Sequence, residues 1–194
     1  MVQIVLIRPG STDYDEQGRI QGNLDIPLSQ QGADEVKRLI EQLRGEQLPV
    51  LYSSPCQAAW QTASQIADAL GIKLKKLDKM QNLDHGLWQG MLVDDVKRKQ
   101  PKVYRQWQDQ PEIICPPEGE MLTGAHQRVQ NALTKILKKH KEGKIGLVLP
   151  EPLASLAHAY LCQSELGDLW KSTCVCGSWE TLTVEADLSV HSGS

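Results

Sequence analysis

The chain has 194 residues, a length typical of one domain, and a formal net charge of −3 at neutral pH. The mildly acidic balance, with no dominant basic block, argues against a general nucleic-acid binder. No apolar run approaches the roughly 20 residues of a membrane helix, and residues 2–7 are too short for the apolar region of a signal peptide. We therefore expect one cytoplasmic domain over residues 1–194, without a membrane or nucleic-acid partner.

The first predicted strand is Val2–Ile7, which is apolar except for Gln3 and is therefore expected to be buried on both faces. Arg8, Pro9 and Gly10 end it, and a long loop is expected to follow. Open α/β sheets bind ligands at the carboxyl ends of their strands. Arg8 is therefore a candidate anion-binding residue, with a surface salt bridge as the alternative.

Strands and helices then alternate. Ser29 is the expected N-cap of a helix with apolar residues at helical spacing, and Pro49–Ser53 is a second buried strand. Ser54 is the expected cap of the next helix, with Pro55 at its first position and Gly71 at its end. This order is typical of a parallel sheet with crossover helices.

The second half continues the pattern. Further strands are predicted at residues 72–77 and 145–149. Helices are predicted at 92–108, with a break at Pro101, and at 122–140 and 152–161. Residues 83–91 and 111–119 are expected to be connectors. Two alternating segments within 172–190 are expected to be antiparallel edge strands, which could pair two copies into a homodimer. The predicted fold is a three-layer α/β/α sandwich, with a mostly parallel sheet and an antiparallel edge.

The cysteines show no disulfide framework, because their number is odd and their spacing irregular: Cys56, Cys115, Cys162, Cys174 and Cys176. Cys174 and Cys176 are predicted to be small core residues, since one intervening residue does not make a redox or zinc motif. No His or Cys cluster has metal-ligand spacing, so neither a metal nor another cofactor is expected. Reduced thiols fit a cytoplasmic protein.

The first third of the chain resembles the opening of the histidine phosphatase superfamily, in its phosphoglycerate mutase-like branch. That family opens with a strand, then Arg-His-Gly-x-Thr, then Arg-x-Gln-Gly-x-x-Asp-x-Pro-Leu and a helix. The matching residues are Arg8, Gly10, Thr12, Arg19, Gln21, Gly22, Asp25, Pro27, Leu28 and Gly32. Weaker similarity continues to about residue 160, and the resemblance implies a phosphoglycerate mutase-like fold.

The chain departs from this family where the chemistry lies. By the resemblance, Pro9 stands in the place of the nucleophilic His and Pro150 in the place of the second His. Ala58 stands in the place of an Arg, and Asn82 in the place of the acidic proton donor. The family's reaction needs an imidazole that attacks phosphorus, cations around the phosphoryl oxygens and an acid for the leaving group. Proline offers neither a nucleophile nor a backbone N–H.

The remaining pocket is expected to bind phosphate weakly or not at all. Of the family's roles only Arg8 survives, and Asp15 and Glu151 would bring negative charge toward it. Arg8 is either structural, paired with Asp15 or Glu151, or still a ligand-binding residue. The expected pocket residues are Arg8, Gly10, Thr12, Asp15, Gln21, Gly22, His85 and Glu151.

Two functions follow. The first is a catalytically inactive member of the family, a pseudophosphatase that binds an unidentified protein or small ligand. The second is a phosphatase or phosphoglycerate mutase-type enzyme that uses a displaced catalyst near Arg8. His85 is the candidate for that catalyst, although an exposed loop position is the favoured interpretation of this residue.

Overall fold

A five-stranded sheet forms the centre of the computed structural model, which describes residues 1–172 and 175–185. The strand order is β3-β2-β4-β1-β5. The strands are β1 (Val2–Ile7), β2 (Val50–Ser53), β3 (Lys73–Lys76), β4 (Gly143–Val148) and β5 (Trp179–Val184). The first four are parallel, and β5 pairs antiparallel with β1 at one edge. The predicted mostly parallel sheet with an antiparallel edge is confirmed.

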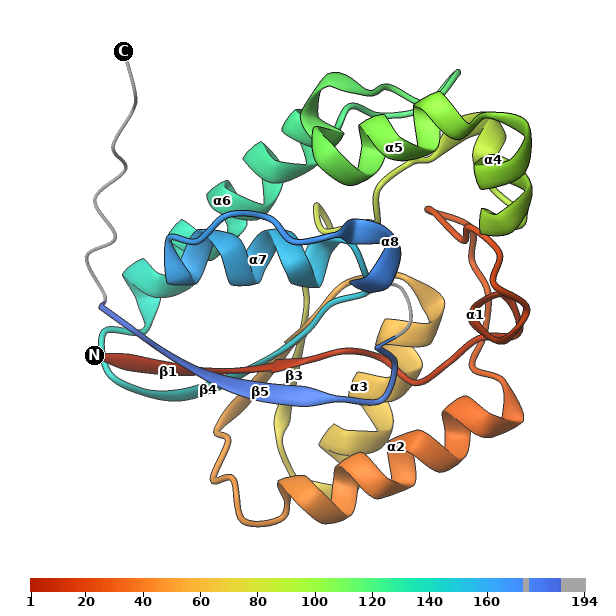
Figure 1. Ribbon diagram of the computed structural model, residues 1–194. Coiled ribbons are helices and arrows are strands. Elements are labelled where there is room, and N and C mark those ends of the chain that lie inside the picture. Colours follow the sequence, from red (N-terminus) through yellow and green to blue (C-terminus); the bar gives the residue numbers. More distant parts are fainter. Residues whose placement is uncertain (173–174, 186–194) are drawn as a thin grey trace.

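Helices cover both faces of this sheet, as Figure 1 shows, with α2 and α3 on one face and α6 and α7 on the other. The described helices are α1 (Asp13–Gln17), α2 (Gln30–Leu43), α3 (Gln57–Leu70), α4 (Val93–Lys99), α5 (Pro101–Asp109), α6 (Leu122–Lys139), α7 (Leu153–Cys162) and α8 (Leu169–Ser172). The three-layer prediction is therefore confirmed, as is the helix break at Pro101. No helix in the described part is long and apolar enough to cross a membrane.

The core lies in two layers, and β1 contributes to both. Ile4 and Leu6 pack on the side of α6 and α7, whereas Val5 and Ile7 pack on the side of α2 and α3. All four side chains are fully buried. Because successive strand residues face opposite sides, a continuous apolar run is what a central strand between two helical layers requires.

Several local predictions are wrong. The loop expected after β1 contains α1, and the chain between α7 and β5 contains α8. The residue that caps α3 is Cys56, not Ser54; the Ser54 hydroxyl instead donates to the Met80 carbonyl at 2.7 Å. Within the described part of 172–190 there is one strand, β5, rather than two. Cys174 and residues 186–190 lie outside the described residues.

Candidate functional site

A cavity of about 310 Å³ lies at the carboxyl ends of β1 and β4. Ile7 and Val148 are register partners, so the residues that follow these strands leave the sheet side by side. The cavity wall contains every residue that the sequence placed at the site: Arg8, Pro9, Gly10, Thr12, Asp15, Gln21, Gly22, Ala58, Asn82, His85, Pro150 and Glu151. The tertiary structure thus brings together positions that are up to 143 residues apart.

Gly10 is held at the base of the site by its neighbours. A Cβ atom at this position would clash with the carbonyl group of Gly32, at the start of α2. The Gly10 N–H donates to Thr62 Oγ1 of α3 at 3.2 Å. The absence of a side chain therefore lets the strand end lie directly against α2.

Arg8 is hydrogen-bonded to two carboxylates of the protein itself. Its Nε atom donates to Glu151 Oε1 at 2.7 Å and its Nη1 atom to Glu180 Oε1 of β5 at 2.9 Å. The second oxygen of Glu151 accepts from the hydroxyl of Ser155 at 2.7 Å. Burial lowers the pKa of Arg8, but the hydrogen bonds to Glu180 and Glu151 outweigh burial and raise it. Glu151 was an expected partner, Asp15 is not one, and Glu180 was not predicted.

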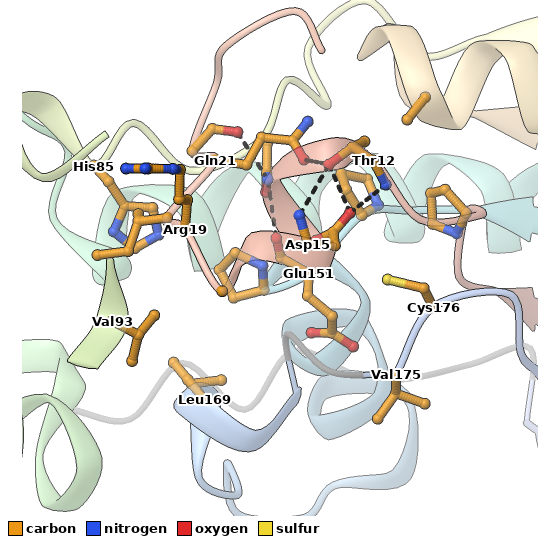
Figure 2. Close-up of a pocket in the computed structure, with 18 of the residues that line it drawn as sticks. Thr12, Asp15, Arg19, Gln21, His85, Val93, Glu151, Leu169, Val175 and Cys176 are labelled. Atoms are coloured by element: carbon orange, nitrogen blue, oxygen red, sulfur yellow. Dashed lines mark hydrogen bonds between the residues drawn. The ribbon is translucent and has the colours of Figure 1, made fainter. Parts of the chain in front are cut away.

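Asp15 belongs to a helix cap. Its Oδ2 atom accepts from the Thr12 backbone N–H at 2.7 Å and from the Thr12 hydroxyl at 2.8 Å, while the Asp15 N–H returns a bond to that hydroxyl. This reciprocal pair starts α1 where we expected a loop. Gln21 Oε1 lies 3.1 Å from the same hydroxyl. Burial raises the pKa of Asp15 despite the bonds from Thr12, and Figure 2 shows the group in the cavity wall.

Asn82 ties three segments together. Its Nδ2 atom donates to the carbonyl of Gly22 at 3.0 Å and to the carbonyl of Glu151 at 2.9 Å. Its Oδ1 atom accepts from the N–H of Leu83 at 2.9 Å. A side chain that both donates and accepts is required for this set of partners, so a carboxylate could not replace it without losing the two donated bonds.

His85 is buried, so the favoured interpretation of an exposed loop residue is wrong. The residue is 7% exposed and its ring packs 5.4 Å from that of Trp107 and 6.4 Å from that of Trp88, measured between centroids. The Nδ1 atom is buried without a hydrogen-bond partner. Burial lowers the pKa of His85 from 6.5 to about 4, against the charges of Asp84 and Glu120. The ring is therefore neutral at pH 7.

The low pKa of His85 predicts that stability falls in mild acid. Between pH 6.5 and about 4 the unfolded chain binds a proton on this ring and the folded protein does not. The free energy of unfolding should therefore fall by up to about 3 kcal/mol from this group as the pH drops through that window. Urea denaturation of the wild type and of His85→Phe across this range measures the difference; parallel losses in both proteins would contradict it.

Other cavity residues were not predicted; Arg19 belongs to the Arg-x-Gln-Gly segment that carries the resemblance, whereas nothing local marks the rest. Trp107, Trp170 and Arg19 lie in the wall, as do Cys56 and Cys176. The core position predicted for Cys176 is wrong: this residue is only partly buried and faces the cavity. Burial and the charge of Asp15 raise the pKa of its thiol to about 12, so it stays protonated at neutral pH.

The described part of the chain contains no cluster of His, Cys, Asp or Glu that could hold a metal ion. Within the same residues, the thiols of Cys56, Cys115, Cys162 and Cys176 are free. The donors present at the cavity are therefore Arg8, Arg19, the neutral ring of His85, and hydroxyl and amide groups. This set can bind through hydrogen bonds and charge, and His85 supplies an imidazole, the group that the family's reaction uses as the phosphorus nucleophile.

Comparisons with known proteins identify the family and the fold. The sequence profile of the histidine phosphatase superfamily (branch 1) matches residues 4–190. Phosphoserine phosphatase 1 of Hydrogenobacter thermophilus is 32% identical over 185 residues, 95% of this chain and 88% of that protein. Phosphoglycerate mutase-like protein 4 of Arabidopsis thaliana is 33% identical over 150 residues, 75% of this chain and 65% of that protein. The solved structure of Bacillus stearothermophilus YhfR superposes with a TM-score of 0.83 at 22% identity, over 95% and 92% of the two chains.

Proposed function

The chain belongs to the histidine phosphatase superfamily, branch 1, and we propose that it uses the family's cavity to bind a ligand without transferring a phosphoryl group. The observation that carries the proposal is the composition of the cavity wall. Pro9, Ala58, Asn82 and Pro150 all lie in that wall. By the family resemblance these are the places of the nucleophile, a cation, the acid and the second imidazole, and none has the required side chain.

The charges around Arg8 support the same proposal. Catalysis of phosphoryl transfer depends on preorganised cations that face the phosphoryl oxygens. Arg8 instead faces Glu151 and Glu180, at 2.7 and 2.9 Å. A phosphate would have to compete with two carboxylates already bonded to the guanidinium, and would meet their repulsion. Loss of a nucleophile alone lowers kcat by a factor on the order of 10⁶.

The second candidate is a phosphatase or mutase with a displaced catalyst. Two observations favour it: related proteins carry the names phosphoserine phosphatase and phosphoglycerate mutase-like protein, and His85 lies in the cavity wall with a neutral ring. A neutral imidazole is the nucleophilic form of histidine. His85 is enclosed by Trp rings, however, and the guanidinium of Arg8, the cation retained from the family's site, is already bonded to two carboxylates.

A turnover assay separates the two candidates. Purified wild-type protein is expected to release no phosphate from p-nitrophenyl phosphate, phosphoserine or 3-phosphoglycerate above a mock-purified preparation, because the cavity lacks a positioned nucleophile. An intact family member assayed beside it establishes the sensitivity. Turnover by the wild type that disappears in folded His85→Phe would overturn the binding proposal and assign catalysis to His85.

A further inference from the structure

β3 forms one edge of the sheet, and its outer side is unpaired within residues 1–172 and 175–185. The strand order places β2 on its inner side and no strand on its outer side. Among those residues, no other segment hydrogen-bonds to the backbone of β3. An edge of this kind offers free N–H and C=O groups, to which an extended segment of another chain can add a strand.

Lysine side chains extend from both faces of β3. Lys75 lies on the side of α6, with its ammonium group 5.5 Å from the centre of the Tyr52 ring. Lys73 shares that face, because strand side chains two residues apart point the same way. Lys76 lies on the opposite side, over the ring of Trp60 of α3 at 4.3 Å. These aromatic contacts hold one ammonium group on each face of the edge strand.

The helix α6 adds lysines to one of these faces. Arg128 of α6 donates to the Lys79 carbonyl at 3.1 Å, so this side of the helix faces the segment that follows β3. Lys135 and Lys139 follow Arg128 at helical spacing and lie on the same side of α6. We call this set of residues the lysine edge: Lys73, Lys75, Lys76, Lys79, Lys135 and Lys139.

The lysine edge has no counter-ions in the part of the chain that the structure describes. None of its ammonium groups forms an ion pair there, whereas Lys37, Lys99 and Lys144 each pair with a carboxylate. The acids beside it in the sequence, Asp78 and Glu142, are exposed. The whole chain has a formal net charge of −3, so this excess of positive charge is local. A surface field of one sign attracts a partner of the opposite sign.

His140 lies where the lysines of the strand and of the helix meet. Its Nε2 atom is 2.9 Å from the hydroxyl of Tyr52. Burial lowers the pKa of His140, and the charges of Lys139 and Lys75 lower it further. Cations from β3 and from α6 thus act on one ring, and a carboxylate beside them would reduce their mutual repulsion.

An acidic strand fits this edge better than other partners do. A second copy would place lysine against lysine, which is how edge strands avoid pairing with each other. Single-stranded nucleic acids stack on exposed aromatic rings, but Tyr52 is buried and Trp60 lies beneath Lys76. A membrane surface is bound through exposed apolar side chains, and among the described residues no large exposed one belongs to β3 or α6.

We propose that the open edge of β3 binds an acidic segment of another protein in an extended conformation, which adds a strand to the sheet and pairs its carboxylates with the lysine edge. This inference goes beyond the proposed function, because no residue of the lysine edge lines the cavity. The turnover assay therefore tests the cavity, and a peptide-binding assay tests the edge of the sheet.

Three labelled hexapeptides test the charge of the partner. They alternate Thr with Glu, Gln or Lys, and their binding to the wild-type protein is followed by fluorescence anisotropy at low ionic strength. The Glu peptide is expected to bind at least about tenfold more tightly than the Gln peptide, the sum of a few exposed ion pairs, and the Lys peptide least tightly. Equal affinity for the Glu and Gln peptides, or no binding of the Glu peptide, would overturn the inference.

A fourth peptide tests whether the partner binds as a strand. It is the Glu peptide with N-methyl groups at alternate backbone nitrogens, which keeps every carboxylate but removes N–H donors that a sheet edge would accept. Its affinity is expected to be at least about tenfold lower than that of the unmodified Glu peptide. Unchanged affinity would mean that charge alone holds the peptide, and would overturn the added strand.

A pair of double variants locates the binding surface. Lys73→Gln with Lys76→Gln removes one exposed charge from each face of β3, and affinity for the Glu peptide should fall about tenfold. The control is Lys97→Gln with Lys102→Gln on α4 and α5, where Lys97 lies over the Tyr104 ring at 5.7 Å much as Lys76 lies over Trp60. The control should bind like the wild type, and an equal loss in both would contradict the assignment to β3.

Other occupants of the edge give distinct results. Tighter binding of oligouridylate or of phosphatidylserine vesicles than of the Glu peptide would overturn the acidic segment in favour of a nucleic acid or a membrane. A wild-type dimer in analytical ultracentrifugation that the Glu peptide dissociates would assign the edge to a second copy. A monomer that prefers the Glu peptide to both polyanions is the expected result.

Discussion

Replacing Arg8 by methionine is expected to lower the free energy of unfolding by about 3–5 kcal/mol at neutral pH. Arg8 is 14% exposed and Glu151 8% exposed, so water screens this ion pair poorly. Methionine occupies much of the same space but removes the cation, which leaves the Glu151 carboxylate with Ser155 as its remaining side-chain donor. The loss therefore comes mainly from a buried charge without a counter-ion. Urea denaturation at pH 7 measures it.

Two further variants show whether the ion pair is responsible. Arg44→Met breaks an exposed i,i+3 pair with Glu41 and should leave the free energy of unfolding nearly unchanged. The double variant Arg8→Met with Glu151→Gln should recover part of the loss, because the stranded charge is gone. A loss of less than about 1 kcal/mol in Arg8→Met alone would mean that Arg8 is free to bind a ligand.

The second large effect is expected for Asn82→Asp, which should lower the free energy of unfolding by about 2–6 kcal/mol. The substitution hardly changes the shape, but a carboxylate cannot donate to the carbonyls of Gly22 and Glu151. Two buried acceptors would lose a partner, at about 1–3 kcal/mol each, and a negative charge would face them. Thermal and urea denaturation at pH 7 measure the loss.

The pH dependence of this loss has a definite sign. Burial beside carbonyl groups should raise the pKa of the introduced carboxyl in the folded protein, so the ionised form is the destabilising one. The difference in unfolding free energy between wild type and Asn82→Asp should therefore grow as the pH rises above about 4, the usual pKa of an Asp side chain. The control Asn131→Asp alters an exposed residue of α6 and should shift stability by about 0.5 kcal/mol or less. An equal effect at both sites would contradict the structural role of Asn82.

Asn82 and Glu151 show how the wall of the cavity is held together. Asn82, which by the resemblance stands in the place of the family's acid, joins the segments around Gly22 and Glu151 by donated hydrogen bonds. Glu151 accepts a hydrogen bond from Arg8 and pairs with its charge. Buried polar groups without partners are costly, so side chains that pair with their neighbours stabilise the wall of the cavity.

Most of the fold could be predicted from local patterns. The apolar run Val2–Ile7, the Ser29 cap and the helical spacing that follows each describe one element, and each was located correctly. Elements of four or five residues, α1 and α8, were missed because so short a helix shows no periodicity. The expected cap at Ser54 failed because its hydroxyl has a tertiary partner, the carbonyl of Met80.

The sequence by itself determined the family and the alternation of strands and helices, and the resemblance predicted that Pro9, Ala58, Asn82 and Pro150 stand at the family's reactive positions. These properties follow from the identity and spacing of neighbouring residues. Only the tertiary structure decided which partners the side chains around the cavity have. The partner of Arg8 on β5, Glu180, lies 172 residues away, and the rings that enclose His85 come from separate elements. Contacts of this kind depend on how strands and helices that are distant in the sequence pack together, so no pattern of neighbouring residues predicts them.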